Sequence, residues 1–327
     1  MRKFLKRIGL DGFVMWLLVA ITLAWIAPQI GSDHESWSPS EVAGWGVTVI
    51  FFFYGLRLSP SKFKAGLSNV KLHVVIHTAT FILFPLLALG VMALVDIQQN
   101  YHLWVGVFFM ATLPSTVSSA VVMVSMAKGN VPAAIFNASI SSLMGVFLTP
   151  LWMSIFISSS NGGTSLNEVV IKLIVQVIIP IGLGLFLNRF WGKFAEKHKK
   201  PLKIFDQAVI VAIVYTAFCE SFETKMFSTV SFPVLLMLIV GMGALFFAVY
   251  FIILLVGRWL KFNREDRITA LFCGSKKSLV HGTVMSRILV SDVTLVGIII
   301  LPIMIYHILQ LMIVSVIAQK MSKQAGN

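Results

Sequence analysis

Phe272-Cys273-Gly274-Ser275-Lys276-Lys277-Ser278 interrupts a largely apolar stretch at residues 267–290. Neighbouring residues of a helix point about 100° apart, so Lys276 and Lys277 cannot easily share one polar face. A charged side chain at the centre of a membrane helix costs roughly 2.5–3.5 kcal/mol. Because Gly274 tolerates an unusual backbone, the segment predicts a broken helix whose two ammonium groups reach a polar site. The alternative is a cytoplasmic loop whose lysines anchor the topology.

A second interruption lies at residues 112–119, Thr-Leu-Pro-Ser-Thr-Val-Ser-Ser. Pro114 removes a backbone donor and clashes with the preceding turn, so it breaks or kinks a helix. The hydroxyl groups of Thr116, Ser118 and Ser119 can satisfy the freed carbonyl groups or coordinate a cation. The stretch therefore predicts either a binding site at a helix break or a simple proline kink that hydroxyl groups stabilise.

The whole chain is too apolar for a soluble protein. Of its 327 residues, 57% are hydrophobic and 12% are charged, whereas soluble domains carry about 25% charged residues. Runs of about 20 apolar residues match the hydrocarbon thickness of a bilayer, where a lone segment satisfies its backbone only as a helix. The sequence predicts an all-α membrane protein with ten transmembrane helices, near residues 12–30, 44–58, 72–95, 103–127, 131–157, 169–190, 204–220, 232–256, 267–290 and 293–319.

Lysine and arginine gather in alternate loops of this ten-helix arrangement. Both terminal segments and the loops after the second, fourth, sixth and eighth spans are basic, whereas the intervening loops contain little lysine or arginine. Basic loops face the cytoplasm, so both termini are predicted to be cytoplasmic. These loops also explain the formal net charge of +13. The expected surroundings are therefore a lipid bilayer, and nucleic acid is not expected as a partner.

An even number of spans with both termini on one side permits two inverted halves of five helices. These repeats are predicted at about residues 1–160 and 161–327, within a single integral membrane unit. The interrupted fourth and ninth spans then occupy equivalent positions. The loop at residues 192–203 is the natural seam, with helices 1–6 in residues 1–191 and helices 7–10 in residues 192–327.

The fifth span adds four polar side chains that can contribute to a site: Asn137, Ser139, Ser141 and Ser142. Asn137 and Ser141 are four residues apart and share one helix face. Such residues either form hydrogen bonds between helices or coordinate a cation or substrate through neutral oxygen atoms. Both interpretations are open from the sequence.

Ser275 and Ser278 flank the two lysines and are candidate binding residues together with them. No acidic residue lies securely within an apolar span to pair with Lys276 or Lys277. Either desolvation deprotonates one lysine, or an anionic ligand or backbone carbonyl groups compensate the charge. An anionic substrate follows from the second option. The sequence has no phosphate-binding loop, zinc-type cysteine cluster or hydrolase triad, so neither an enzyme nor a bound organic cofactor is expected.

Several segments resemble the bile acid:sodium symporter (SBF-like) family, including its orphan bacterial branch: Thr116-Val117-Ser118-Ser119, Ala127-Lys128-Gly129-Asn130-Val131, Phe147-Leu148-Thr149-Pro150-Leu151 and Cys273-Gly274-Ser275-Lys276-Lys277-Ser278-Leu279. The resemblance covers nearly the whole chain in the number and order of spans. It implies a core domain and a panel domain, with helices 4 and 9 broken at Pro114 and Gly274 and crossing in the core. It also implies transport by alternating access across a bacterial inner membrane.

The resemblance further implies a sodium site on the fourth and fifth helices. The family uses a Thr-x-Ser-Asn segment after the first break, and Thr116, Ser118 and Ser119 match it with serine in place of asparagine. Hydroxyl groups of the fifth helix complete the family's site, and the candidates here are Ser139, Ser141 and Ser142, with Ser139 and Ser142 as the possible sodium ligands.

The ninth helix departs from the family pattern of Glu-x-Gly-x-Gln-Asn. Phe272 or Cys273 stands at the position of the glutamate, depending on the register, and Lys276 and Lys277 fall near the Gln-Asn pair. An ammonium group at a sodium ligand position opposes sodium electrostatically. The lysine then either replaces one sodium ion outright or leaves the transporter coupled to protons or to no ion.

The leading interpretation is a secondary active transporter of a small organic anion, with sodium-coupled symport as one form of it. A proton-coupled transporter is one alternative. A regulatory or scaffolding membrane protein that kept the fold and lost transport is the other. The sequence specifies neither the substrate nor the oligomeric state, and a monomer is compatible with it.

Overall fold

The computed structural model describes residues 12–33, 38–57, 69–157, 171–172, 174–290 and 292–324, without the side chains of Ser118, Ile157, Thr229 and Gln324. Every regular element in this part of the chain is helical. The helices are α2 (Gly12–Ile26), α3 (Pro39–Arg57), α5 (Val70–Thr78), α6 (Phe84–Met92), α7 (Tyr101–Thr112), α8 (Ser118–Met126), α9 (Val131–Ile157), α11 (Ile179–Lys197), α12 (Lys199–Glu223), α13 (Phe232–Trp259), α14 (Arg264–Gly274), α15 (Leu279–Leu289) and α16 (Val293–Gln324).

Short turns connect several of these helices. Two are π-helical: η2 (Ala79–Leu83) joins α5 to α6, and η4 (Ile174–Ile178) leads into α11. Three are 3-10 turns: η1 (Pro28–Ile30), η3 (Gln98–Asn100) and η5 (Met226–Thr229).

Six stretches of the described residues are long and apolar enough to cross a membrane: Val70–Met92, Val131–Phe156, Ile174–Lys197, Lys199–Glu223, Phe232–Trp259 and Val293–Lys323. The helices α7, α8, α14 and α15 have only 9 to 12 residues each, because an interruption divides each of the two predicted spans that contain them. The predicted all-α, multi-span membrane fold is confirmed. The count of ten spans and the inverted repeats remain predictions.

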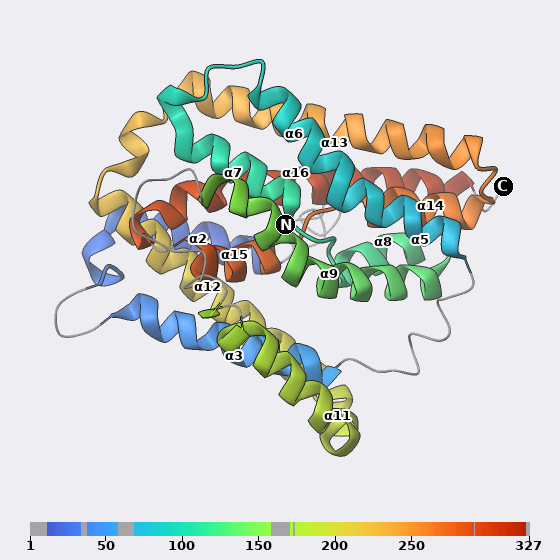
Figure 1. The fold of residues 1–327 in the computed structure, drawn as a ribbon, viewed down its shortest axis with the longest axis horizontal. Coiled ribbons are helices and arrows are strands. Elements are labelled where there is room, and N and C mark those ends of the chain that lie inside the picture. The colour runs from blue at the N-terminus through green and yellow to red at the C-terminus, as the bar shows by residue number, and fades with distance from the viewer. Residues whose placement is uncertain are drawn as a thin grey trace.

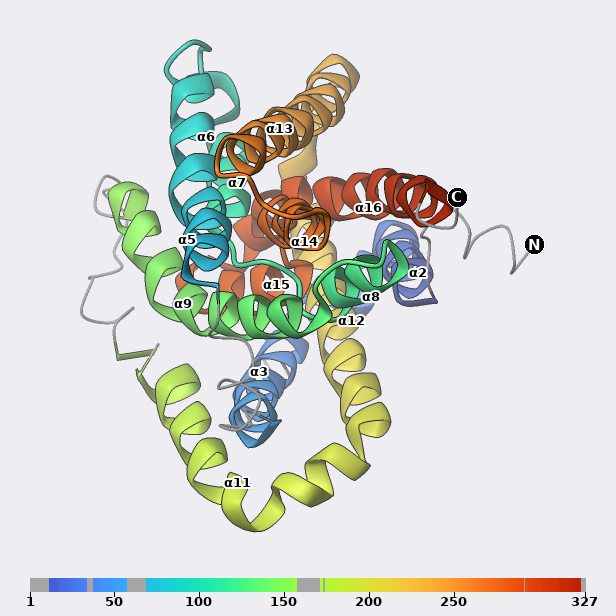
Figure 2. The same ribbon diagram turned by 90° about the vertical axis from the view of Figure 1, so that its right-hand side faces the viewer.

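The helices pack in two groups (Figure 1). We refer to α2, α3, α11 and α12, which are joined by the contacts of α3 with α11 and of α12 with α2 and α3, as the panel helices, and to α5–α9 and α13–α16 as the core helices. Figure 2 shows α3 and α11 below the core helices, with α12 rising from α11 toward them. Because α12 packs against α2, α3 and also α16, it is the main connection between the two groups.

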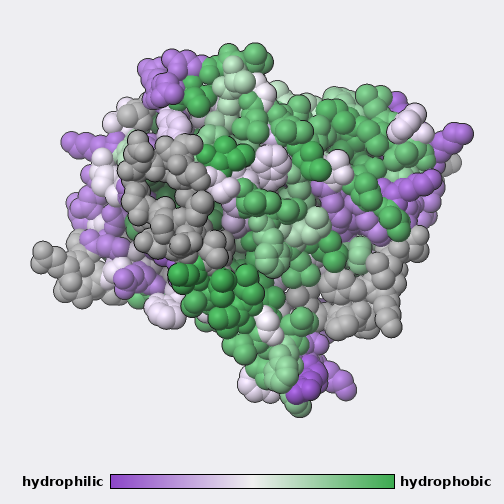
Figure 3. All heavy atoms as spheres, in the orientation of Figure 1, coloured by the Kyte–Doolittle hydropathy of each residue, from purple (hydrophilic) through white to green (hydrophobic). Residues whose placement is uncertain are grey.

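An apolar surface covers the middle of the molecule. In the view of Figure 3, apolar residues spread over its centre, and hydrophilic residues gather toward its left and right ends. Large apolar side chains on several helices are exposed, among them Trp45 at 74% and Leu151 at 67%. Exposed apolar surface of this extent marks contact with lipid in a protein of this composition.

The panel helices α3 and α11 approach each other through glycine. A Cβ atom on Gly55 would clash with the carbonyl oxygen of Ile181, and one on Gly184 would clash with that of Phe52. Small residues allow such close backbone approach between membrane helices, where packing rather than the hydrophobic effect drives association. The two glycines therefore fix the distance between α3 and α11.

Gly184→Ala is expected to destabilise the protein by about 1–3 kcal/mol, because the added methyl group forces the two backbones apart. Gly182→Ala is the matched control on the same helix, since nothing lies within 4 Å of its added Cβ atom. Thermal unfolding in detergent measures both variants. Equal unfolding temperatures for the two would contradict the close-packing argument.

Candidate functional site

The first predicted break is present between α7 and α8. The α7 helix ends at Thr112, Leu113 is extended with φ −67° and ψ 151°, and α8 begins at Ser118. Pro114 has no N–H and cannot continue the hydrogen-bond ladder of α7. Since buried carbonyl groups rarely stay unpaired, those near Pro114 need partners from elsewhere in the fold.

Side chains from α9 and from the second break supply such partners. The Thr149 hydroxyl donates to the Thr112 carbonyl oxygen at 2.9 Å. The carbonyl oxygens of Ala111 and Leu113 both accept hydrogen bonds from the Lys277 ammonium group. The conformation at Pro114 therefore depends on contacts with α9 and with the second break, and it is more than a local kink.

The second predicted break lies between α14, which ends at Gly274, and α15, which begins at Leu279. The Tyr306 hydroxyl of α16 donates to the Ser275 carbonyl oxygen at 2.8 Å. Gln310, one turn further along α16, accepts from the Lys277 N–H at 2.8 Å and donates to the Lys277 carbonyl oxygen at 2.7 Å. Side chains of α16 thus form hydrogen bonds with both N–H and carbonyl groups of the unwound backbone.

The two breaks contact each other directly. The Ser115 hydroxyl donates to the Cys273 carbonyl oxygen at 2.6 Å, and the Ser278 N–H donates to the Pro114 carbonyl oxygen at 2.9 Å. Ser141 of α9 accepts from the Ser115 N–H at 2.9 Å. Two segments more than 150 residues apart thereby form one polar centre inside the core helices.

Lys277 lies at the middle of this centre. Its side chain is fully buried. Its Nζ donates to the carbonyl oxygens of Thr80 at 2.7 Å, Ala111 at 2.6 Å and Leu113 at 2.8 Å, and it lies 4.2 Å from the centre of the Phe84 ring. An ammonium group has three donors, and all three are used. The negative end of the α7 dipole and the face of the aromatic ring also favour a positive charge here.

The Thr80 carbonyl group is available because of the π-helical turn η2 and a proline. In this turn, the Phe84 N–H donates to the Ala79 carbonyl oxygen, five residues back. The next donor in the same pattern belongs to residue 85, which is proline and has no N–H. The Thr80 carbonyl oxygen is therefore left for Lys277. π-Helical turns often occur at functional sites for this kind of reason.

Lys276 has a different environment. Its side chain is also fully buried, and its Nζ donates to the Ser119 Oγ atom at 2.7 Å. The Ser119 hydroxyl in turn donates to the Thr116 Oγ1 atom at 2.9 Å. Within the described part of the chain, Lys276 forms no ion pair. Unlike Lys277, it therefore has a buried charge that its own protein compensates only in part.

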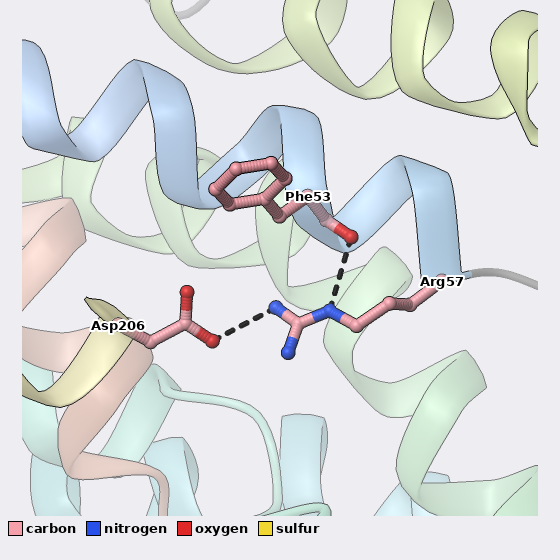
Figure 4. A network of polar contacts seen from close by, with 3 residues as sticks. All are labelled: Phe53, Arg57 and Asp206. Carbon is pink, nitrogen blue, oxygen red and sulfur yellow. Dashed lines mark hydrogen bonds and ion pairs between the residues drawn. The ribbon is translucent and has the colours of Figure 1, made fainter. Parts of the chain in front are cut away.

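Arg57 shows how the same chain treats another cation. Its Nη2 atom forms an ion pair with Asp206 Oδ2 at 2.8 Å, and its Nε donates to the Phe53 carbonyl oxygen at 3.0 Å (Figure 4). This pair lies within the panel helices, on α3 and α12, and both side chains are partly exposed. A carboxylate thus accompanies Arg57, whereas backbone carbonyl groups and hydroxyl groups surround the two buried lysines.

The other sequence-predicted residues divide between several local networks. Asn137 pairs with His73 of α5 at 3.1 Å, between Oδ1 and Nδ1. The hydroxyl groups of Ser139 and Ser142 donate back to the α9 carbonyl oxygens of Ile135 and Ala138. Ser275 Oγ donates to the Leu271 carbonyl oxygen, and Ser278 Oγ caps α15 by accepting from the His281 N–H. None of these hydrogen bonds reaches Lys276, and the Ser118 side chain lies outside the described part.

The hydroxyl groups expected to bind sodium are poorly suited to it beside Lys276. A hard cation binds oxygen at about 2.4 Å, so an ion on Ser119 Oγ would lie within about 5 Å of the lysine nitrogen. At an effective dielectric constant of about 20, two like charges at that distance repel by about 3 kcal/mol. The residues of the first break therefore do not fit a sodium ion while Lys276 is charged.

Several side-chain hydrogen bonds connect core helices to panel helices. The Tyr54 hydroxyl donates to the Ser139 carbonyl oxygen at 3.1 Å. Arg287 Nη2 donates to the Ser40 carbonyl oxygen at 2.9 Å. The Ser221 hydroxyl donates to the Thr294 carbonyl oxygen at 2.7 Å. The last two lie at the end of the molecule where α15 ends and α16 begins.

Sequence reasoning missed several residues that build the centre. Gln310, Tyr306 and Phe84 contribute side chains, and Thr80 contributes only its carbonyl oxygen. Gln310 carried a signal, because it is a buried polar residue in a long apolar helix. The Thr80 carbonyl group gives no such signal in the sequence, because every residue has a backbone carbonyl group.

Several known proteins are similar to this chain over almost its whole length. The model of the SBF-like CPA transporter family matches residues 11–323. The chain is 35% identical to "Putative symporter YfeH" of Escherichia coli over 96% of this chain and 94% of the relative. It is 34% identical to "Uncharacterized protein PA2026" of Pseudomonas aeruginosa, over 96% and 93%. It is 30% identical to "Sodium/bile acid cotransporter 7" of Danio rerio, over 96% and 94%.

These matches extend over almost the whole chain and confirm the resemblance seen in its two broken spans. They also agree with the absence of an enzymatic motif. The chain therefore belongs to the SBF-like CPA transporter family, whose members are membrane transporters rather than enzymes.

Proposed function

We propose that the protein is a secondary active transporter of a small organic anion and works by alternating access. The observation that carries this proposal is Lys276, whose buried ammonium group has a hydrogen bond to Ser119 and no ion pair among the described residues. A buried charge is costly unless it is paired. An anionic substrate that enters the site supplies the missing charge.

The hydroxyl groups next to Lys276 suit such a substrate. Thr116 and Ser119 are joined by a hydrogen bond; Ser119 lies in the first turn of α8, and Thr116 lies two residues before this helix. The first N–H groups of a helix favour negative charge. A carboxylate or sulfonate group is the simplest ligand that uses an ammonium group and hydroxyl donors together. The candidate substrate-binding set is therefore Thr116, Ser119 and Lys276, with Ser118 as a further candidate.

Alternating access also belongs to the proposal. Transporters with inverted repeats bind their substrate near the middle of the membrane, between discontinuous helices, and one group of helices then moves against the other. Ten spans, cytoplasmic termini and movement of the panel helices against the core helices are parts of the same proposal. It is supported by the direct contact between the two helix breaks.

Uptake by the purified protein in proteoliposomes tests the proposal. A set of radiolabelled mono- and dicarboxylates and sulfonates, with and without a sodium gradient, is expected to include at least one anion that shows saturable uptake. The same anions are expected to raise the unfolding temperature of the protein, because a ligand that binds only the native state stabilises it. If no anion is taken up and no anion raises the unfolding temperature, the proposal is contradicted. That result would favour a regulatory or scaffolding role.

A further inference from the structure

We infer that the two lysines are built-in cations at the crossing of the helix breaks, and that Lys277 permanently fills a cation site where no sodium ion binds. The site consists of the three carbonyl oxygens of Thr80, Ala111 and Leu113. They lie 2.6–2.8 Å from the Lys277 Nζ atom. In the selectivity filters of potassium channels, backbone carbonyl oxygens replace the hydration shell of a monovalent cation in this way.

Separate sequence features make the three carbonyl groups available. Two come from the end of α7, where Pro114 stops the helix, and one comes from the π-helical turn before Pro85. The freed oxygens all face one point, the Lys277 Nζ atom. Their arrangement is that of a site for a positive ion, and this chain supplies the ion as a side chain.

The lysine also leaves no room for a second ion. Lys277 is fully buried, its three donors are all used, and the Phe84 ring covers it at 4.2 Å. Gln310 holds the backbone of the same residue through its N–H and its carbonyl group. The ammonium group therefore cannot leave without unfolding of the break, in contrast to a bound sodium ion, which exchanges with solvent.

Lys276 places a second positive charge beside the remaining hydroxyl groups. Its Nζ lies 2.7 Å from Ser119 Oγ, which is one of the oxygens expected to bind sodium. The two lysines together thus occupy the positions at the crossing that a pair of coupling cations would need. One consequence of this inference rests on the proposed function, namely that transport does not depend on a sodium gradient. The inference about the cation site does not.

Thermal unfolding of the purified protein without substrate tests the inference. Wild type and variants are compared in sodium chloride, potassium chloride and N-methyl-D-glucamine chloride at equal ionic strength. Wild type is expected to unfold at the same temperature in all three salts. Lys277→Ala is expected to unfold at a lower temperature, and sodium is expected to raise it by about 1–3 °C for each tenfold increase in concentration above the dissociation constant.

Two further variants serve as controls. Lys277→Met fills most of the space of the lysine stem without its charge, so it is expected to be destabilised and to show no response to sodium. Lys320→Ala removes an exposed lysine of α16 and is expected to behave as wild type. If Lys277→Ala does not fold, the comparison of the three salts on the wild type still tests the inference, because sodium-specific stabilisation of the wild type would overturn it.

Sodium-specific stabilisation of the wild type would overturn the inference and leave anion transport untouched. Lack of any sodium effect on Lys277→Ala, in a folded protein, would show that the three carbonyl groups are not a cation site. Uptake assays are evaluated separately. An anion flux that is indifferent to sodium supports both proposals, whereas sodium-independent stability without any anion flux contradicts the transport function alone.

Discussion

Lys276→Gln is expected to take up the anion with much lower apparent affinity and to keep its fold. A hydrogen bond between charged groups contributes about 1.5–3 kcal/mol, so the loss of the ammonium group is expected to weaken apparent substrate affinity by about 10- to 150-fold. Glutamine can still donate a hydrogen bond toward Ser119. It also removes a buried charge that has no ion-pair partner among the described residues, which compensates for part of the lost contact.

The measurement is the concentration dependence of uptake in proteoliposomes, together with the unfolding temperature of each variant. Lys320→Gln is the control, because Lys320 is exposed. Thr116→Val is expected to give a smaller loss of affinity, since it removes a neutral partner rather than the charge. Wild-type affinity in Lys276→Gln would show that the substrate binds elsewhere.

The positions of both breaks could be predicted because they violate local rules. Pro114 cannot donate to a helix ladder, and two adjacent lysines cannot both avoid lipid on a regular helix. The structure has non-helical backbone at both places. Local conflict with the expected helix was therefore informative, as it often is at functional sites.

The separate roles of the two lysines could not be predicted. Lys276 and Lys277 are neighbours with the same chemistry, and only the fold determines that one meets carbonyl groups and the other meets Ser119. The Thr80 carbonyl oxygen is free because of Pro85, five residues later, and it faces Lys277 only after α5 and α14 pack together. Such contacts depend on tertiary structure, which residue spacing does not encode.

The fifth-span residues show the same limit. Asn137 and Ser141 share a helix face, as their spacing predicts. In the structure, Asn137 pairs with His73 of α5, whereas Ser141 binds the Ser115 N–H at the first break. One helix face thus contacts two different elements. The sodium site predicted from Ser118, Ser119, Ser139 and Ser142 remains a prediction, and the charge of Lys276 opposes it.

Arg287 forms a polar connection between core and panel helices at one end of the molecule. It lies at the end of α15, and its Nη2 atom donates to the Ser40 carbonyl oxygen at the start of α3. Asp33 accepts from both the N–H and the hydroxyl of Ser40, and its own N–H donates to Glu220 of α12. The negative charges of Asp33 and Glu220 favour the nearby guanidinium group. This network is expected to hold that end closed in the conformation described.

Arg287→Ala is expected to shift the equilibrium toward the state in which this end is open. A hydrogen bond from a charged donor contributes about 1.5–3 kcal/mol. We expect the lower end of this range for Arg287. Its Nε atom is buried without a hydrogen-bond partner among the described residues, which offsets part of the stabilisation. A change of about 1.5 kcal/mol corresponds to an increase of about tenfold in the open population.

Ser221→Cys reports this population, because Ser221 is fully buried between α12 and α16 in the closed arrangement. Maleimide is expected to modify the cysteine about tenfold faster in the Arg287→Ala background, since a small open population limits the rate. Cys219→Ala removes the nearest native thiol, and Cys273 is buried in the core helices. Arg258→Ala, an exposed substitution at the end of α13, is the matched control. Equal modification rates in all backgrounds would mean that Arg287 does not hold the core and panel helices together, and that the closed end depends on the direct packing of α12 against α16 instead.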